Sequence, residues 1–423
     1  MQEHALRQKL HNEIHARPYE RLVTPALISH MAFLADLSLQ AEAHAHLCGL
    51  LADHHLPLPA EGTGFYAADV GPVRLRWERH GEFVSYTFIR QGLAPEALGW
   101  FEHPACADIS REWLDTIPGE RICANHVALL PEEALEGQWS LPDLDAVLDA
   151  DALVASDVAD GQARVHTDLR IHADGFARFV VQSQVLSPRR RGRLAQRLLE
   201  IETYRLLALL ALPEARRITP LLGGYELELA TLMDAIRNSD GDRQTLARLS
   251  ELASTVEGLF AQHHARFTAS AAYYDLVNRR IADLHERQFQ GLQTIGQFMD
   301  RRLAPAMQTC AQATRRLQGL SERISRCSNL LRTRVEIQVQ QQNGELLASM
   351  NRRQYLQLRL QQTVEGLSIA AITYYASTLV GHMVEAAHRW LHLDATMVQG
   401  ASIPLIALTL WIMLRRAHRR LAH

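Results

Sequence analysis

Two apolar segments near the C-terminus constrain this chain more than any other feature. Residues 367–384 (LSIAAITYYASTLVGHMV) and 398–414 (VQGASIPLIALTLWIML) contain no Asp, Glu, Lys or Arg. Each lies near the lower limit of the ~17–25 residues that a membrane-spanning helix needs. A buried hairpin in a soluble core is the alternative, but no later segment follows to cover it. We therefore expect two transmembrane helices.

Basic residues flank this pair of segments and predict its orientation. The flanking arginines are Arg352, Arg353, Arg359, Arg415, Arg416, Arg419 and Arg420. The connecting stretch carries only Arg389, balanced by acidic residues. Because basic residues favour the cytoplasmic side, both termini are predicted to be cytoplasmic, which in a bacterium means the inner membrane. The polar N-terminus lacks the apolar core of a secretory signal peptide.

Composition limits the function of the remaining chain. The 423 residues carry a net charge of only −3, which argues against a nucleic-acid-binding protein with a basic face. The five cysteines are scattered and odd in number, as expected in a reducing compartment. A chain of this length exceeds a single core of ~250–300 residues, so we expect more than one soluble part.

The first part predicts an α+β domain with a mixed, mostly antiparallel sheet. Period-2 alternation and turn residues predict strands at residues 26–34, 65–70, 73–80, 82–90 and 121–130, and a hairpin of 163–172 with 175–186 across Ala173-Asp174-Gly175. Helices are predicted at residues 38–56, about 106–115 and 141–150.

After residue 186 the pattern becomes helical. A helix is expected to end by Pro213, and a second one over residues 214–236 to be interrupted near Pro220 and Gly223-Gly224. A loop at residues 238–244 should precede one long helical region with a coiled-coil-like seam. The seam consists of Leu303, Met307, Cys310, Ala313, Leu317, Leu320, Ile324, Cys327, Leu331 and Val335. Its partner is either an earlier helix of the same chain or another subunit.

The predicted organisation therefore has four parts. They are an α+β cytoplasmic domain at residues 1–186, a long helical region at 187–365, two transmembrane helices within 366–415 (about 367–384 and 398–414), and a basic cytoplasmic tail at 416–423.

Residues that could form a site are few. No phosphate-binding loop, dinucleotide fingerprint, nucleophile elbow or zinc-protease motif is present, so we predict no catalytic residue, metal or cofactor. His166, Asp168, Arg170 and His172 alternate along a predicted strand and would share one face, either as a polar ligand face or as a solvated surface.

Other segments rich in polar groups are interpreted as structural. The stretch at residues 10–20 predicts an N-terminal helix ended by Pro18, and WERHGEFVSYTF (residues 77–88) a hairpin with a charged rim. In LLEIETYR, Glu200, Glu202 and Arg205 are expected to form ion pairs.

Five stretches carry a resemblance to a known family: residues 10–18, 77–88, 166–181, 197–205 and 364–375. Together they resemble a bacterial, membrane-anchored family catalogued as domain of unknown function 3422, along nearly the whole chain. The resemblance implies a C-terminal anchor and brings no activity, cofactor or catalytic residue.

The architecture is also similar to the CorA-type cation channels, in which a long helix continues into the first span. Those channels carry a Gly-Met-Asn signature, whereas this chain has Gly381-His382-Met383. Thr373, Ser377 and Gly381 recur every four residues and could face a pore.

These observations predict a non-enzymatic, membrane-anchored scaffold or interaction protein, with a CorA-like homo-oligomeric ion channel or transporter as the alternative. The expected partners are the lipid bilayer, further copies of the chain and a protein partner, but no nucleic acid.

Overall fold

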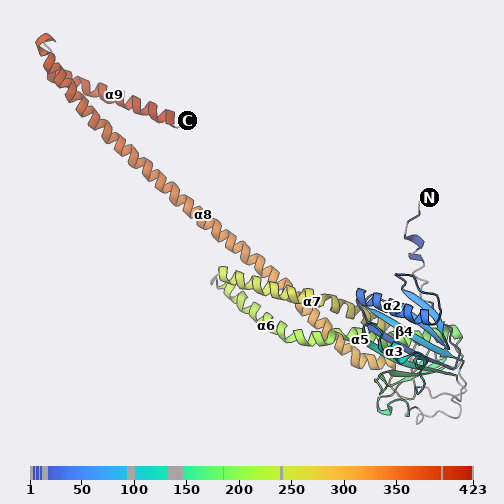
Figure 1. Cartoon of the computed structure of the whole chain (residues 1–423). Helices are drawn as coiled ribbons and strands as arrows, with labels where there is room; N and C mark the ends of the chain where they lie inside the picture. The colour runs from blue at the N-terminus through green and yellow to red at the C-terminus, as the bar shows by residue number, and fades with distance from the viewer. Residues whose placement is uncertain are drawn as a thin grey trace. The chain divides into compact units, whose positions relative to one another are not determined.

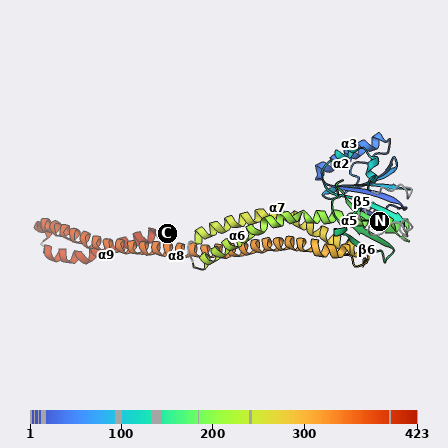
Figure 2. The ribbon, with the colours of Figure 1, turned by 90° about the horizontal axis from the view of Figure 1, so that it is seen from below.

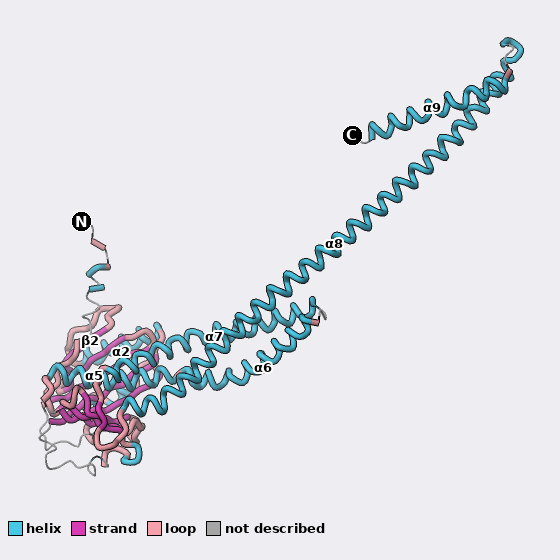
Figure 3. Tube along the Cα trace, turned by 180° about the vertical axis from the view of Figure 1, so that it is seen from behind, coloured by secondary structure: helices cyan, strands magenta, loops and turns pink. Residues whose placement is uncertain are grey.

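The computed structural model describes residues 3–4, 6–8, 10–11, 18–92, 101–131, 144, 146–183, 185–238, 242–391 and 394–421. The chain divides into two compact units, Met1–Cys327 and Ser328–His423. The strands gather in the first unit, where helices pack around them (Figure 3).

The first unit contains a nine-stranded sheet, in the order β2-β3-β4-β1-β5-β8-β7-β6-β9. Its strands are β1 (Ala26–Leu34), β2 (Phe65–Val70), β3 (Val73–Arg79), β4 (Phe83–Gln91), β5 (Glu120–Pro131), β6 (Val154–Val158), β7 (Ala163–Thr167), β8 (Ala177–Ser183) and β9 (Arg287–Gln288). Neighbouring strands run antiparallel, except that β5 and β8 are parallel. The predicted α+β class and mostly antiparallel sheet are therefore confirmed.

Strand β1 lies in the interior of this sheet and separates two cores. Alternate side chains of a strand point to opposite faces. Leu27 and Met31 contribute to a core shared with α2 (Leu37–Asp53), η2 (Ala105–Asp108) and α3 (Arg111–Asp115). Ile28 packs on the other side with α5 (Pro188–Leu209). Figure 2 shows α2 and α3 on one side of the strands and α5 on the other.

Most predicted strands and the first helix appear at their expected positions, with a few corrections. The helix expected at 106–115 is instead the two short pieces η2 and α3, separated at Ile109 and Ser110. Strands β6 and β9 were not predicted. Of the helix expected at 141–150, residues 141–143 and 145 lie outside the described residues, but the prediction is wrong for the second half, where residues 146–148 form turns and a bend and Ala150 begins the 3-10 turn η4 (Ala150–Ala152).

Three long helices complete the first unit with α5 (Figure 1): α6 (Ala211–Arg237), α7 (Asp242–Ala282) and the start of α8 (Ile295–Leu391). The predicted interruption of α6 is wrong, because the helix continues through Pro220 and both glycines. Buried Ile218 and Leu222 flank this proline and pack against neighbouring helices, so tertiary packing outweighs the proline's local cost.

The seam predicted along α8 finds its partner within the same chain. Cys310, Leu317 and Ile324 pack with residues of α6 and α7, including Leu222 and Phe267. The helical region is not continuous, however. Residues 283–294, with strand β9, separate α7 from α8. Of the loop expected at 238–244, residues 239–241 lie outside the described residues, and α7 already begins at Asp242.

The second unit contains the remainder of α8 and a further helix, α9 (Ala395–Leu421). Both predicted apolar segments are helical, and α8 and α9 each contain a stretch long and apolar enough to cross a membrane. Large apolar side chains are exposed on both helices, among them Leu367, Leu379, Leu405 and Met413. The predicted domain boundaries remain a prediction.

Candidate functional site

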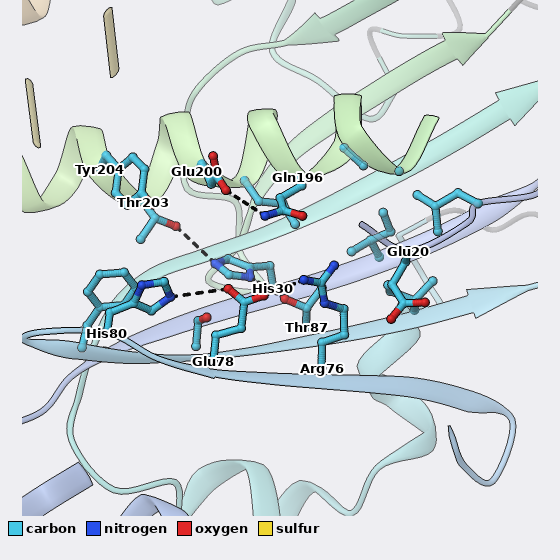
Figure 4. A pocket seen from close by; sticks show the side chains of 18 residues that line it. Glu20, His30, Arg76, Glu78, His80, Thr87, Gln196, Glu200, Thr203 and Tyr204 are labelled. Carbon is cyan, nitrogen blue, oxygen red and sulfur yellow. Dashed lines mark hydrogen bonds and ion pairs between the residues drawn. The ribbon is translucent and has the colours of Figure 1, made fainter. Parts of the chain in front are cut away.

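A cavity of about 50 Å³ lies in the first unit between the sheet and α5 (Figure 4). Its floor is formed by strands β1, β3 and β4, and its roof by one face of α5. The described residues that line it include several polar side chains, among them His30, Arg76 and Glu78, and some of these polar side chains contact one another.

Strand geometry places the polar group on one face. Arg76 and Glu78 are two residues apart on β3, so both point toward α5, whereas Trp77 between them is fully buried in the opposite core. Cross-strand pairing brings His30 of β1 opposite Thr87 of β4, which in turn lies opposite Arg76.

Glu78 is held as a carboxylate at the centre of this group. Its Oε1 accepts a hydrogen bond from the Arg76 guanidinium at 2.6 Å, and its Oε2 lies 3.5 Å from His80 Nε2. Burial alone would raise the pKa of Glu78, but the hydrogen bond from His80 and the nearby Arg76 together lower it to about 2. Arg76 is also placed over the Phe65 ring, 5.3 Å from its centroid.

His30 is the second fixed group. Its two ring nitrogens lie 2.8 Å from Thr87 Oγ1 and 3.2 Å from Thr203 Oγ1, so both are engaged by hydroxyls. Burial lowers the pKa of His30 to about 4, which keeps the imidazole neutral at physiological pH. The hydroxyl of Thr203 continues this chain by contacting the Cys123 thiol at 3.6 Å.

Helix α5 forms the roof of the cavity and packs closely against the chain segment before β1. Gly192 lies against the Glu20 carbonyl, and a Cβ at this position would overlap the carbonyl oxygen. One turn further, Gln196 donates to Glu200 at 2.8 Å, and Glu200 is paired with Arg280 of α7. The Gln196 Oε1 atom is buried and has no hydrogen-bond partner among the described residues.

The ionisation states of Glu78 and His30 favour a role in binding over a role in proton transfer. A general acid or base works best with a pKa near the operating pH. The pKa values of Glu78 and His30 lie well below neutral, at about 2 and about 4. A water molecule needs ~10–15 Å³ of such space, so the cavity has room for a few waters or a very small polar molecule.

The four residues predicted as a polar face do not lie along one strand. Strand β7 ends at Thr167, so only His166 belongs to it, and Leu169 adopts a positive φ of 53°. His166 is buried and stands edge-on to Phe289, with its pKa lowered to about 4 by burial. The prediction of a shared strand face is therefore wrong.

The other three residues, Asp168, Arg170 and His172, lie in the loop after β7, which the Asp168 carboxylate holds together. Asp168 is buried and accepts hydrogen bonds from the backbone amides of Asp149 at 2.9 Å and Arg170 at 3.1 Å. His172 Nε2 lies 2.8 Å from the same carboxylate, and Arg170 pairs with Asp149. Among the described residues, no group of three or more His, Cys, Asp or Glu side chains is arranged to hold a metal ion. Whether the loop binds another ligand remains a prediction.

The three residues predicted to face a pore share one face of α8 in the second unit. Thr373 and Ser377 are buried, and Gly381 faces the Gln399 side chain of α9, whose Cδ would lie 2.9 Å from an added Cβ. In the isolated chain this face is therefore the contact between the two apolar helices. A pore-lining role remains a prediction.

Sequence reasoning missed the cavity residues, although it singled out their segment. WERHGEF was interpreted as a hairpin with a charged rim, whereas Glu78 and His80 point into the cavity. The spacing of Arg76 and Glu78 was the available signal, because it places two charged groups on one face of β3, with His80 just after the strand. The ion pairs expected in LLEIETYR are confirmed by Glu200 with Arg280 and by Glu202 with Arg205. Residues 12–17 of the N-terminal stretch lie outside the described residues.

The long helices, the mostly antiparallel sheet and the pair of apolar C-terminal helices together describe a protein with a folded body and a C-terminal segment suited to a membrane. The chain belongs to the family described as "Protein of unknown function (DUF3422)", whose model matches residues 2–421. No curated protein matches the chain. No solved structure matches it either.

Proposed function

We propose that this protein is a non-enzymatic, membrane-anchored scaffold that self-associates and holds its folded body at the bacterial inner membrane. Its two apolar helices cross the bilayer as a hairpin, with both termini in the cytoplasm. The observation that carries the proposal is the exposure of apolar side chains on the end of α8 and on α9, such as Leu367 at 72% and Met413 at 70%. Contact with lipid removes this apolar surface from water.

The flanking arginines support the orientation. Arg352, Arg353 and Arg359 precede the first span, and Arg415 and Arg416 follow the second. An excess of basic residues on the cytoplasmic side sets the orientation of such hairpins. The anchor is tested by deleting residue 367 onward. The truncated chain should leave the membrane fraction, and a truncated chain that stays with the membrane would exclude the proposed anchor.

Self-association is proposed through the part of α8 that precedes the first span. Residues 336–364 are all exposed, and Val339, Leu346, Met350, Leu360 and Val364 continue the line of the seam there, with the polar residues Gln342, Arg353 and Gln357 at the steps between them. Isolated helices in water are marginal, because most helical stability comes from packing an amphipathic face. A second copy of the same helix supplies this packing, in continuity with the seam already packed against α6 and α7.

Cysteine cross-linking of the full-length protein in its membrane tests this interface. Met350→Cys places a thiol on the seam, and Ala348→Cys places one on the opposite side of the same helix. We expect an oxidative cross-link between copies for Met350→Cys and none for Ala348→Cys, beyond what the unsubstituted chain gives. Equal cross-linking by both variants, or a monomer in detergent, would contradict the interface.

The cavity supports a non-enzymatic role, since the pKa values of Glu78 and His30 are displaced from the range useful for proton transfer. For the CorA-like alternative, the relevant observation is the polar face formed by Thr373 and Ser377, which in a channel would turn toward a shared axis. We favour a packing role because Gly381 of this face already meets Gln399. Flux of divalent cations into liposomes containing the protein would instead favour the channel.

A further inference from the structure

A second cavity, of about 200 Å³, lies on another part of α5 in the first unit. Arg190, Arg193 and Arg197 line one side of it, and their spacing of three and four residues places them on one face of the helix. The loop after α7, with Asp283 and His285, forms the opposite side. We call this cavity the arginine pocket.

The positive charge in the arginine pocket is only partly balanced. Arg197 is neutralised, because its guanidinium donates to the Asp283 carbonyl at 2.9 Å and lies 3.6 Å from the Asp283 carboxylate. Arg190 donates at 2.5 Å to the uncharged amide oxygen of Gln162, and Arg193 is placed over the Tyr19 ring, 5.3 Å from its centroid. Within the described part of the chain, neither Arg190 nor Arg193 has a carboxylate at ion-pair distance.

The lining therefore carries an excess of positive charge. Three arginines face two carboxylates, those of Asp160 and Asp283, so the sum is +1 with His285 neutral. A guanidinium presents several N–H donors in a planar fork that matches the oxygens of a phosphate group. At the same ~10–15 Å³ for each water, the pocket of about 200 Å³ has room for roughly a dozen waters or more, enough for a tetrahedral oxyanion and part of its substituent.

We propose that the arginine pocket binds a phosphate group, with Arg190 and Arg193 as its principal ligands and Arg197 held in place by Asp283. The phosphate group belongs either to a soluble phosphate compound or to the headgroup of an anionic phospholipid. Both sources present the same oxygens to the guanidinium groups, and separate probes distinguish them.

The test uses the full-length protein in a neutral detergent and a phosphate-free buffer. Isothermal titration calorimetry with inorganic phosphate examines the soluble source, and titration with short-chain phosphatidic acid, compared with short-chain phosphatidylcholine, examines the lipid source. We expect saturable binding of one of the two phosphate probes. The double variant Arg190→Gln with Arg193→Gln should weaken it about tenfold or more, since both charge-assisted contacts are lost.

Arg189→Gln is the matched control, because it removes a positive charge from the same turn of α5 without removing a residue of the pocket lining. We expect it to change the dissociation constant less than twofold, and the double variant to keep the wild-type melting temperature. If the double variant fails to fold, replacing both arginines with lysine keeps the charge and should still weaken binding, because lysine lacks the fork. Absence of binding by both probes, or equal losses for the control and the double variant, would overturn the proposal.

Discussion

Gly192 provides a sharp test of how α5 is seated on the sheet. An alanine Cβ at this position would overlap the Glu20 carbonyl oxygen and lie 2.9 Å from its carbonyl carbon. Ordinary van der Waals contact begins at 3.4 Å, so the carbon alone requires a displacement of 3.4 − 2.9 = 0.5 Å, and the oxygen requires more. Both groups belong to backbone, so neither can rotate out of the way.

The displacement must be taken up by α5 or by the chain before β1. Buried Leu194 and Leu198 follow Gly192 on α5 and belong to the core beneath it, so movement of the helix disturbs that core. Overpacking of this kind costs ~1–3 kcal/mol. We expect Gly192→Ala to lie at the upper end, at about 3 kcal/mol, because a backbone contact cannot be relieved by a change of rotamer.

Urea unfolding of the full-length protein in detergent, followed by tryptophan fluorescence, measures this loss. Trp77 is fully buried in the sheet and reports on the first unit. With a denaturant dependence of ~1–3 kcal/mol/M, the midpoint should fall by about 1 M or more. The control is Gly319→Ala in α8, where an added Cβ meets nothing within 4 Å and should instead stabilise the helix by ~0.5–1 kcal/mol. A Gly192→Ala protein as stable as the wild type would refute the close approach.

Further predictions concern pH and the start of α8. The pKa of His30 is lowered from 6.5 to about 4. The buried neutral imidazole therefore contributes fully to the free energy of unfolding above pH 6.5, and this contribution, up to roughly 3 kcal/mol, is lost as the pH falls toward 4. The pKa of Glu78 is lowered from 4.5 to about 2, so the free energy of unfolding should fall by a similar amount again between pH 4.5 and 2. Urea unfolding at a series of pH values should show both losses, and the second loss should be absent in Glu78→Gln. At the beginning of α8, Glu286 accepts hydrogen bonds from Ser156 Oγ at 2.7 Å and from the Gly296 amide at 2.9 Å. Glu286→Ala should therefore lower the free energy of unfolding by ~2–4 kcal/mol, and a loss under ~1 kcal/mol would contradict this capping role. Gly296→Ala should destabilise the same capping contact, because its Cβ would come within 2.9 Å of Glu286 Oε2. The loss should be smaller than for Glu286→Ala, since the carboxylate can move. Circular dichroism during heating measures the stability of both variants.

The sequence predicted strands β1–β5 well because their patterns are local. Strand β1 was visible as an apolar run between turn residues, and the β3–β4 hairpin as two alternating runs around a Gly. Strand β9 could not be predicted, because two residues carry no periodicity and pair only through contact with distant β6. The length of β7 was overestimated, since the alternation from His166 to His172 imitates a strand that the positive φ of Leu169 ends.

The candidate site was less visible than the fold. The cavity depends on side chains from β1, β3, β4 and α5, which are far apart in sequence and meet only through strand register and helix packing. The seam in α8 was recognised from its periodicity, but its partner depended on tertiary structure, which periodicity does not encode. For α6, tertiary packing outweighed the local signals of Pro220 and the two glycines.

The pairing of β6 with β9 has a consequence for the order of folding during translation. Strands β1–β5 are complete by residue 131, whereas the part of the sheet formed by β6, β7 and β8 receives its last strand, β9, only at residue 287. Until then β6 presents an unpaired edge, and such edges template pairing with other chains. A nascent chain therefore carries an aggregation-prone edge while α5, α6 and α7 are synthesised, and we expect the protein to depend on chaperones during that interval.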